Sequence, residues 1–265
     1  MSDAEIVTLL DAAHAALTAD PENEALRLRF FERLTDGEMF LLLETEAVGD
    51  TITPRIFDLE SGPMVLAFDR EERLAGFSGG IAPYAALPGR VIAGMLAGQG
   101  IGLGVNLGVP ASEMLLPPEA LDWLSDTLEV GPDEAEGTPE QFHAPKGIPD
   151  VFLTGLDGKL ARCSGLASGA LLAGVTYRGG RRGNMLAFLD AAPGADAALA
   201  RAVSEALVFS GLEVGEIDVA FLRSADPWAV AMGRMALRFD LPNPVQPGAG
   251  PGAPGMDPAR PPRLV

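Results

Sequence analysis

The chain has 265 residues, of which 48% are hydrophobic and 21% are charged, and this composition excludes a wholly disordered protein. The length suggests one large or two small domains. With 37 acidic and 19 basic residues the formal net charge is −18. A field of that sign repels phosphate backbones, so we expect no nucleic-acid partner.

The first five residues are acidic rather than basic, and residues 91–110, which lie within the longest uncharged stretch, are interrupted by six glycines. Neither pattern is typical of an export signal or of a membrane-spanning helix. We therefore expect a cytoplasmic protein without a membrane partner.

Charge divides the chain unevenly, with a formal charge of −15 on residues 1–130 and +1 on residues 151–265. The change coincides with a stretch rich in proline and glycine, which break both helices and strands. After residue 241 the core-forming residues cease, and half of residues 242–265 are proline or glycine. We predict an N-terminal domain over 1–130, a linker over 131–149, a C-terminal domain over 150–241 and a disordered tail over 242–265.

The N-terminal domain begins with apolar residues at helical spacing, which predict a helical hairpin whose second helix starts at Asp20-Pro21. Continuous apolar runs then predict buried strands. The expected elements that follow are strands over 39–43, 55–59 and 64–68, a helix over 88–98, a strand over 101–106 and a helix from Pro117. The turn Ser61-Gly62 joins the second and third of these strands as a hairpin.

In the C-terminal domain the patterns predict a β-β-α-β core with helices on one face. The expected elements are a strand over 151–154, a helix over 156–166, a hairpin of 169–177 and 184–190, a helix over 195–210, a strand over 217–222 and a helix over 228–237. The fold class is therefore α/β to α+β, with two small domains, each a short mixed sheet packed with helices.

This layout resembles the SseB family of bacterial proteins, named for enhanced serine sensitivity. The resemblance covers roughly residues 5–130, through the strand Phe40-Leu41-Leu42-Leu43, the strand Met64-Val65-Leu66-Ala67-Phe68 and the glycine-flanked strand at Gly102–Gly108. It extends more loosely to Leu171–Asp190 and Ile217–Ala220, and it departs from the family where Leu107-Gly108 stands in place of Pro-Gly. It implies a cytoplasmic, non-catalytic protein of undefined molecular role, and it transfers no catalytic residue.

One short motif suggests catalysis. Gly76-Phe77-Ser78-Gly79-Gly80 matches the G-x-S-x-G nucleophile elbow of α/β-hydrolases, which would make Ser78 a nucleophile and His143, the only downstream histidine, its base. A carboxylate for the triad would come from Asp122, Asp126 or Asp133. However, His143 borders the linker, a poor platform for a base, and no oxyanion segment precedes the motif. A serine hydrolase is therefore the alternative rather than the favoured function.

The remaining polar residues favour no cofactor and no metal. His14 and His143 are far apart and lack a carboxylate at helical spacing, so they do not form a metal site, and His14 is interpreted as a helix-surface or hairpin-contact residue. Cys163 is the single thiol, which excludes an internal disulfide, and we interpret it as a small buried group. The glycine run at 98–108 has no phosphate-loop spacing.

Arg178, Arg181 and Arg182 concentrate positive charge at the expected hairpin tip of an acidic chain. They either keep an exposed turn soluble or dock onto an acidic surface, on the N-terminal domain or on a second copy in a homodimer. The favoured function is a non-catalytic binding or regulatory module that takes a protein partner or small ligand at an interdomain groove. A scaffold that self-associates through the hairpin or the tail is a further alternative.

Overall fold

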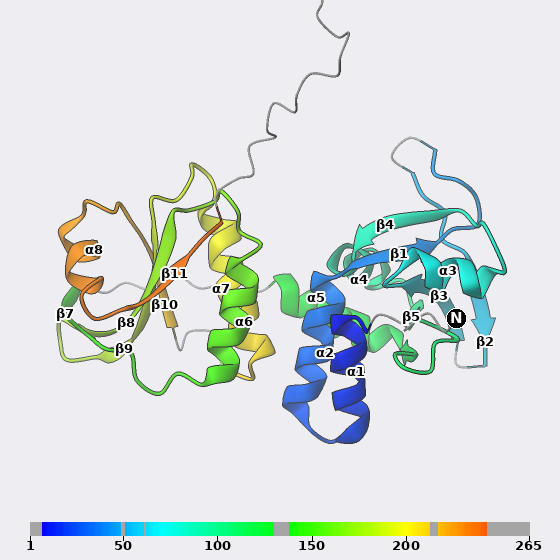
Figure 1. Ribbon diagram of the computed structural model, residues 1–265, viewed down its shortest axis with the longest axis horizontal. Coiled ribbons are helices and arrows are strands. Elements are labelled where there is room, and N and C mark those ends of the chain that lie inside the picture. The colour runs from blue at the N-terminus through cyan, green and yellow to red at the C-terminus, as the bar shows by residue number, and fades with distance from the viewer. Residues whose placement is uncertain (1–6, 49–50, 61, 130–137, 213–216, 243–265) are drawn as a thin grey trace, which may run out of the picture.

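The computed structural model describes residues 7–48, 51–60, 62–129, 138–212 and 217–242. Two mixed sheets, each packed with helices, form two units that lie side by side (Figure 1). The predicted fold class is confirmed. We call residues 7–129 the first unit and residues 138–242 the second unit. None of the helices in these ranges combines the length and apolar character needed to cross a membrane.

The first unit builds its sheet in the order β4-β1-β3-β5-β6, with β2 also paired to β3. Strands β3 and β5 are parallel, and the other pairs are antiparallel. Its elements are α1 (Leu9–Ala19), α2 (Glu24–Asp36), β1 (Glu38–Leu42), β2 (Ile56–Leu59), β3 (Gly62–Phe68), α3 (Glu71–Ser78), β4 (Tyr84–Pro88), α4 (Gly89–Leu96), β5 (Gly102–Val105), β6 (Met114–Leu116) and α5 (Pro118–Glu129).

The helical hairpin, the strands β1, β2, β3 and β5 and the β2–β3 hairpin lie where the sequence predicts them, whereas α3, β4 and β6 were not predicted and α2 begins later than expected. Asn23 rather than Asp20 is its N-cap, because the Asn23 side chain accepts a hydrogen bond from the backbone N–H of Leu26. Helix α1 begins with a capping box, in which Thr8 and Asp11 exchange side-chain and backbone hydrogen bonds.

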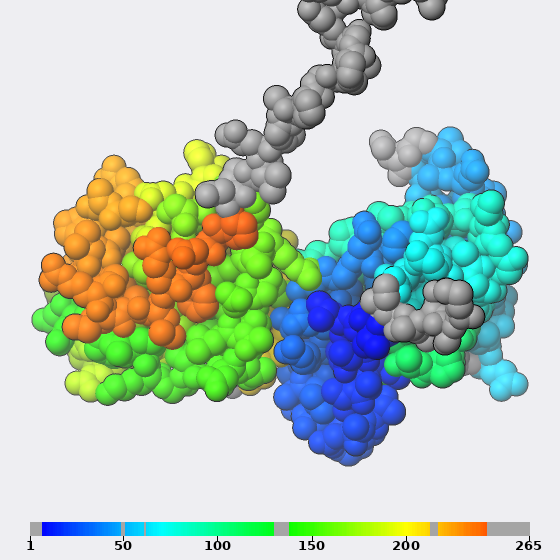
Figure 2. Space-filling view, viewed as in Figure 1, coloured from blue at the N-terminus to red at the C-terminus, as the bar shows by residue number. Residues whose placement is uncertain are grey.

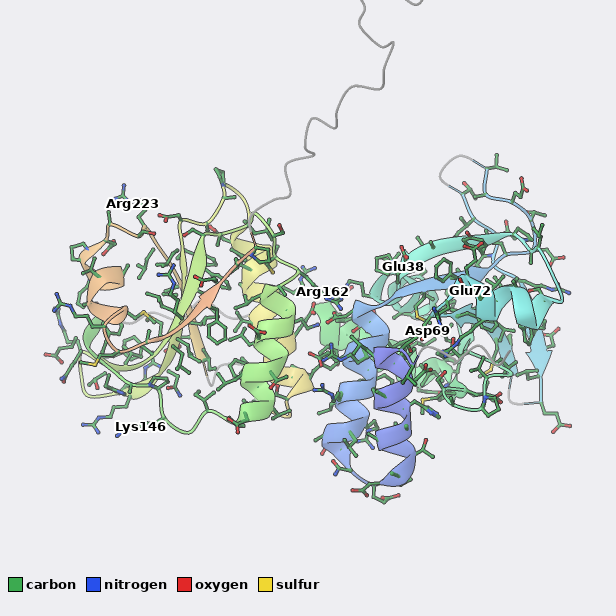
Figure 3. All side chains as sticks on the ribbon, in the orientation of Figure 1. Glu38, Asp69, Glu72, Lys146, Arg162 and Arg223 are labelled. Atoms are coloured by element: carbon green, nitrogen blue, oxygen red, sulfur yellow. The ribbon has the colours of Figure 1, made fainter. Side chains whose placement is uncertain are left out.

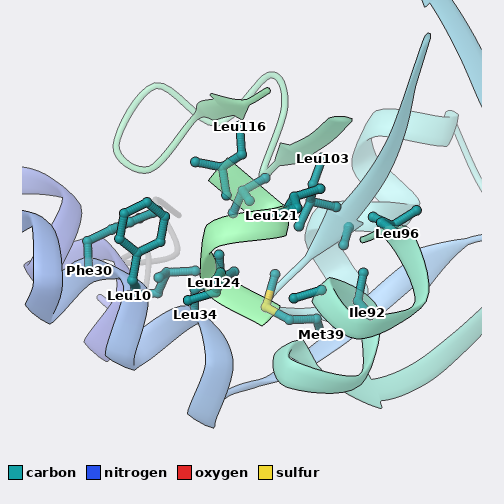
Figure 4. Close-up of a cluster of buried hydrophobic side chains, with 14 of the residues drawn as sticks. Leu10, Phe30, Leu34, Met39, Ile92, Leu96, Leu103, Leu116, Leu121 and Leu124 are labelled. Atoms are coloured by element: carbon teal, nitrogen blue, oxygen red, sulfur yellow. The ribbon is translucent and has the colours of Figure 1, made fainter. Parts of the chain in front are cut away.

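The core of the first unit lies between one face of this sheet and the helices α1, α2, α4 and α5. Leu34 of α2, Met39 of β1 and Leu121 and Leu124 of α5 are all at most 1% exposed and meet in this layer (Figure 4). On the opposite face, Leu74 of α3 packs on a smaller cluster.

A buried polar network fixes α1 against α3. The guanidinium of Arg73 donates to both carboxylate oxygens of Asp11, at 2.7 Å each, and to Asp69 at 2.9 Å. Asp69, labelled in Figure 3, also accepts a hydrogen bond from the Thr8 hydroxyl at 2.6 Å. Burial by itself raises the pKa of Asp11, but the hydrogen bonds from Arg73, Ser112 and Thr8 outweigh burial and hold that pKa well below its usual value.

The second unit builds its sheet in the order β10-β9-β8-β11, with β7 also paired to β8, and β9 and β10 are parallel. The predicted β-β-α-β core, formed by β8, β9, α7 and β10, is confirmed. The elements are β7 (Pro139–His143), α6 (Asp150–Leu160), β8 (Gly169–Tyr177), β9 (Arg182–Leu189), α7 (Asp196–Phe209), β10 (Ile217–Leu222), α8 (Pro227–Met232) and β11 (Leu237–Asp240).

Four expectations for this half of the chain were wrong. Part of the predicted linker 131–149 is strand β7, which pairs with β8, while residues 130–137 lie outside the described residues. The run 151–154 is the start of α6, because Phe152, Leu156 and Leu160 bury one helical face. Residue 237 begins β11 rather than ending a helix, since it pairs with Leu172. The helices also occupy both faces of the sheet, with α6 and α7 on one face and α8 on the other. The predicted tail, beyond Pro242, falls outside the described residues.

The two units share one topology that the sequence patterns did not reveal. In the first unit α2, β1, β3, α4 and β5 occur in this order, with β2 inserted after β1 and with α3 and β4 inserted after β3; β1 is antiparallel to β3, and β3 is parallel to β5. In the second unit α6, β8, β9, α7 and β10 repeat this order with the same strand directions.

The two units meet through their helices, with α2 and α5 packed against α7. In Figure 2 the green atoms of the second unit adjoin the blue helices of the first. The Nζ of Lys159 is 2.8 Å from Asp36 Oδ1 and 2.8 Å from Glu205 Oε2, and all three side chains are 3% exposed. Arg90 closes the set, because it pairs with Asp36 at 2.7 Å and with Glu205 at 2.8 Å. We call these four residues the junction ring.

The close approach of α4 to α2 places Arg90 beside Asp36. Gly89 begins α4 so near to the end of α2 that a Cβ there would lie 1.9 Å from the carbonyl oxygen of Leu34. Arg162, labelled in Figure 3, lies at the junction too, 3.7 Å from Asp36 Oδ2.

Candidate functional site

The candidate site is a groove of about 210 Å³ on the second unit, on the face of the sheet opposite α6 and α7. Helix α8 and strand β7 lie at the end of this unit remote from the first unit (Figure 1). The groove is lined by Pro139, Phe142, Tyr177, Met185, Asp218, Val219, Ala220, Leu222 and Trp228.

Aromatic rings form one wall of this groove. Phe142 of β7 and Trp228 of α8 contact edge to face, with centroids 5.8 Å apart and an interplanar angle of 79°. Phe142 is nearly buried at 9% exposure, whereas Trp228 is 41% exposed. Since an indole carries both a large apolar surface and an N–H donor, an exposed tryptophan in a groove is suited to recognition.

The floor of the groove follows from the strand register. Asp218 of β10 lies opposite Met185 of β9, and because side chains alternate along a strand, Ala220 and Leu222 point to the same face. In the described residues β10 pairs only with β9, so it is the edge strand of this sheet.

A polar end closes the groove at the last residue of β8. The Tyr177 hydroxyl donates to Asp218 Oδ2, and Arg181 Nη2 donates to the same oxygen at 3.2 Å. The Arg181 guanidinium lies 3.9 Å from the centroid of the Tyr177 ring, as a cation–π contact. Arg181 thus lies at the rim, with 52% of its side chain exposed, while the Asp218 side chain is only 11% exposed.

Both contacts to Asp218 use Oδ2. No donor among the described residues reaches its other oxygen, Oδ1. An ionised carboxylate has about four acceptor positions, so Asp218 retains capacity for a cation or an N–H group from a ligand.

Burial, and after it the hydrogen bond to Asp218, raises the pKa of the Tyr177 hydroxyl well above its usual value. Tyr177 is therefore neutral at physiological pH. Its proton remains available to hold the Asp218 carboxylate in place.

Of the three arginines singled out in the sequence, only Arg181 belongs to this groove. Arg178 and Arg182 are exposed, and neither forms a side-chain ion pair with the described residues. The ion pairs that join the two units are Arg90 with Glu205, Lys159 with Asp36 and Arg162 with Asp36. Among the described residues the arginine cluster therefore does not dock onto the first unit.

Where the two units meet, at the place of the expected interdomain groove, the structure has the junction ring, in which Lys159, Asp36 and Glu205 are 3% exposed and Arg90 is 37% exposed. The candidate groove lies on the second unit alone.

Ser78 and His143 are not brought together. Ser78 is the last residue of α3, and the left-handed Gly79 follows it, so it does not occupy a strand-to-helix turn. His143 ends β7 in the other sheet, and α3 and β7 lie at opposite ends of the molecule (Figure 1). The His143 ring covers Gly174 of β8, where a Cβ would lie 2.1 Å from it.

The other expected groups are structural. His14 is 9% exposed, its Nδ1 lies 3.0 Å from the carbonyl oxygen of Ala111, and its ring centroid lies 6.1 Å from that of Phe30 in α2. It is therefore not a surface residue, and its contact with the other helix of the hairpin agrees with the second of the two interpretations. Cys163 is buried as predicted, and burial, with the nearby Glu205 charge, raises the pKa of its thiol. Among the residues with described positions, no three histidine, cysteine or acidic side chains are arranged to hold a metal ion.

Sequence reasoning missed Tyr177, Asp218, Phe142 and Trp228. The available signals were weak: an acidic residue within an apolar strand and a tyrosine next to an arginine-rich turn. Only the register of β10 on β9 shows that the carboxylate faces that tyrosine.

Comparison with protein-family models, with curated proteins and with solved structures found no match to this chain.

Proposed function

We propose that this protein is a non-catalytic binding or regulatory module, and that it binds an extended, basic and apolar peptide segment in the groove of the second unit. The observation that carries the proposal is the aromatic wall of Phe142 and Trp228 ending at the partly satisfied carboxylate of Asp218. The resemblance of residues 5–130 to the SseB family also supports a regulatory role connected with serine sensitivity.

The dimensions of the groove support an extended ligand. Its floor follows β10 from Asp218 to Leu222, which spans roughly 13 Å at the rise of a strand. Four residues of an extended chain have about this length. Aromatic grooves are suited to proline-rich and other extended segments, because such segments lose little conformational entropy on binding.

The charge of the groove supports a basic ligand. Asp218 offers Oδ1 to a donor at the polar end, and the chain as a whole carries a net charge of −18, which favours the approach of a cationic peptide. Arg181 partly offsets Asp218, so we expect one basic residue of the ligand at this position, not a run of them.

A titration tests this function. The variant W123F leaves Trp228 as the single tryptophan, and Trp123 contacts only Phe31 among the described aromatic rings, so phenylalanine is a conservative replacement. Four decapeptides serve as probes: proline-rich with arginine, proline-rich with glutamate, arginine-rich without proline, and glycine–serine. We expect Trp228 fluorescence to report a dissociation constant below about 1 mM for the first peptide only.

The control variants separate the groove from the rest of the surface. We expect D218N to weaken binding of the first peptide at least about fivefold, since a charge-assisted hydrogen bond is lost, while asparagine still accepts from Tyr177. D240N, which removes an exposed carboxylate on β11, leaves the affinity unchanged. Equal binding of all four peptides, or equal effects of the two variants, contradicts the proposal.

The positions of Ser78 and His143 give no support to the serine-hydrolase alternative. We expect a fluorophosphonate probe to leave the protein unlabelled. Labelling that disappears in S78A would refute the non-catalytic assignment.

A further inference from the structure

The chain itself contains a segment that fits the groove. Residues 243–265 include Pro258-Ala259-Arg260-Pro261-Pro262-Arg263, with two arginines against the single acid Asp257. This segment is basic within a chain of net charge −18. Its prolines suit the aromatic wall, and an arginine suits Asp218.

We infer that residues 258–263 of the same chain are the peptide segment that occupies the groove. This inference rests on the proposed function of the groove, because it names the first ligand that the groove meets. An external peptide then binds only when it displaces the segment.

Residues 243–257 are long enough to connect Pro242 to the groove. The described chain ends at Pro242, whose carbonyl oxygen accepts from Gly165 N–H, near the Gly169 end of β8. The polar end of the groove lies at Tyr177, eight residues further along β8, or roughly 26 Å. Residues 243–257 span about 46 Å when extended at roughly 3.1 Å per residue, which covers the distance with length to spare for a reversal of direction.

Proximity makes even weak binding effective. A tether of 15 residues gives an effective concentration on the order of 1 mM. If the free segment binds with a dissociation constant of about 0.1 mM, the groove is about 90% occupied in the intact chain, and an external peptide binds roughly tenfold more weakly.

The charge of the chain favours this occupant over a second copy of the chain. Two copies of a protein with a net charge of −18 repel each other, whereas the basic segment is already tethered to its own groove. A dimer formed by exchange of the segment is therefore an outcome of the test rather than the proposal.

The test uses the full chain carrying W123F, with and without R260E and R263E, and follows Trp228. The probe is a synthetic peptide with the sequence of residues 256–265. We expect it to bind the charge-reversed chain about tenfold more tightly than the parent chain. We also expect acrylamide to quench Trp228, which is 41% exposed in the groove, about twice as strongly once the segment is reversed.

A matched control applies the same change of charge elsewhere. R27E with R238E alters two arginines whose side chains are 51% and 64% exposed and which lie outside the groove. We expect this control variant to bind the peptide as weakly as the parent chain does.

Each result has one meaning. Equal peptide affinity in the parent and in the charge-reversed chain would overturn the intramolecular occupant but leave the groove as a peptide site. No binding of this peptide to either chain, together with no binding of the four decapeptides, would overturn the proposed function as well. A dimer mass in solution that disappears in the charge-reversed chain would assign the segment to the groove of a second copy.

Discussion

The junction ring allows the sharpest stability prediction. In the variant K159M, methionine keeps most of the apolar length of the lysine side chain but removes the charge between Asp36 and Glu205. Both carboxylates are 3% exposed and lie 2.8 Å from the lost ammonium group. They are left with Arg90 and the more distant Arg162 as counter-charges.

The expected loss in the free energy of unfolding follows from the burial of these charged groups. Removing one partner of a buried ion pair typically costs about 3–5 kcal/mol, because the remaining charge is uncompensated. Since Arg90 still pairs with both carboxylates, we expect the lower end, about 3 kcal/mol. The double variant K159M/E205Q restores the balance of one acid and one base, so we expect it to recover at least about 1 kcal/mol of that loss.

Urea unfolding measures the free energy of unfolding of each unit. Trp123 reports on the first unit and Trp228 on the second, each isolated by replacing the other tryptophan with phenylalanine. The control R238M breaks an exposed pair with Asp240, which we expect to cost less than about 0.5 kcal/mol. A loss in K159M no larger than that of R238M, or no recovery in the double variant, would refute the view that the ring holds the units together.

Three further predictions concern single groups. In the folded protein the pKa of Asp11 lies below its unfolded value of about 3.9, so the ionised Asp11 stabilises the fold above that pH and loses this contribution as the pH falls further. The variant D11N should therefore have a lower urea midpoint at pH 7, and its midpoint should decline less steeply below pH 4 than that of the parent. In a Y84F background, absorbance at 295 nm should show that D218N lowers the pKa of Tyr177 without reaching the ordinary value, because burial remains. Iodoacetamide should alkylate Cys163 at least about tenfold more slowly in the native protein than in urea, and equal rates would contradict its raised thiol pKa.

The periodic patterns predicted most elements because their local signals agree with their tertiary environment. Helix α7 and the β8–β9 hairpin lie where apolar spacing predicts them. The run 151–154 was misinterpreted as a strand because a short apolar run is ambiguous, and Gly155 and Gly158 obscured the helical spacing. Strand β7 carries one inward apolar residue, Phe142, so it becomes recognisable only through its pairing with β8.

Most residues of the candidate site could not be predicted from the sequence. Arg181 was singled out because positive charge is rare in this chain, and it does lie at the rim of the groove. Its partners were not found, because Asp218 and Trp228 lie 37 and 47 positions further along the chain. The G-x-S-x-G match shows the converse error, since Ser78 has the right neighbours in sequence but ends a helix.

The sequence by itself determined the alternation of helices and strands, the acidic character of the chain and the basic, proline-rich composition of its last residues, because these depend on local spacing and composition. Tertiary structure alone decided that α8 covers a different face from α6 and α7, that β10 aligns Asp218 with the polar end of the groove, and that the units join through buried charges. Those features depend on register and packing between distant segments. A shift of β10 by one residue would turn Asp218 to the opposite face, and no local pattern records that choice.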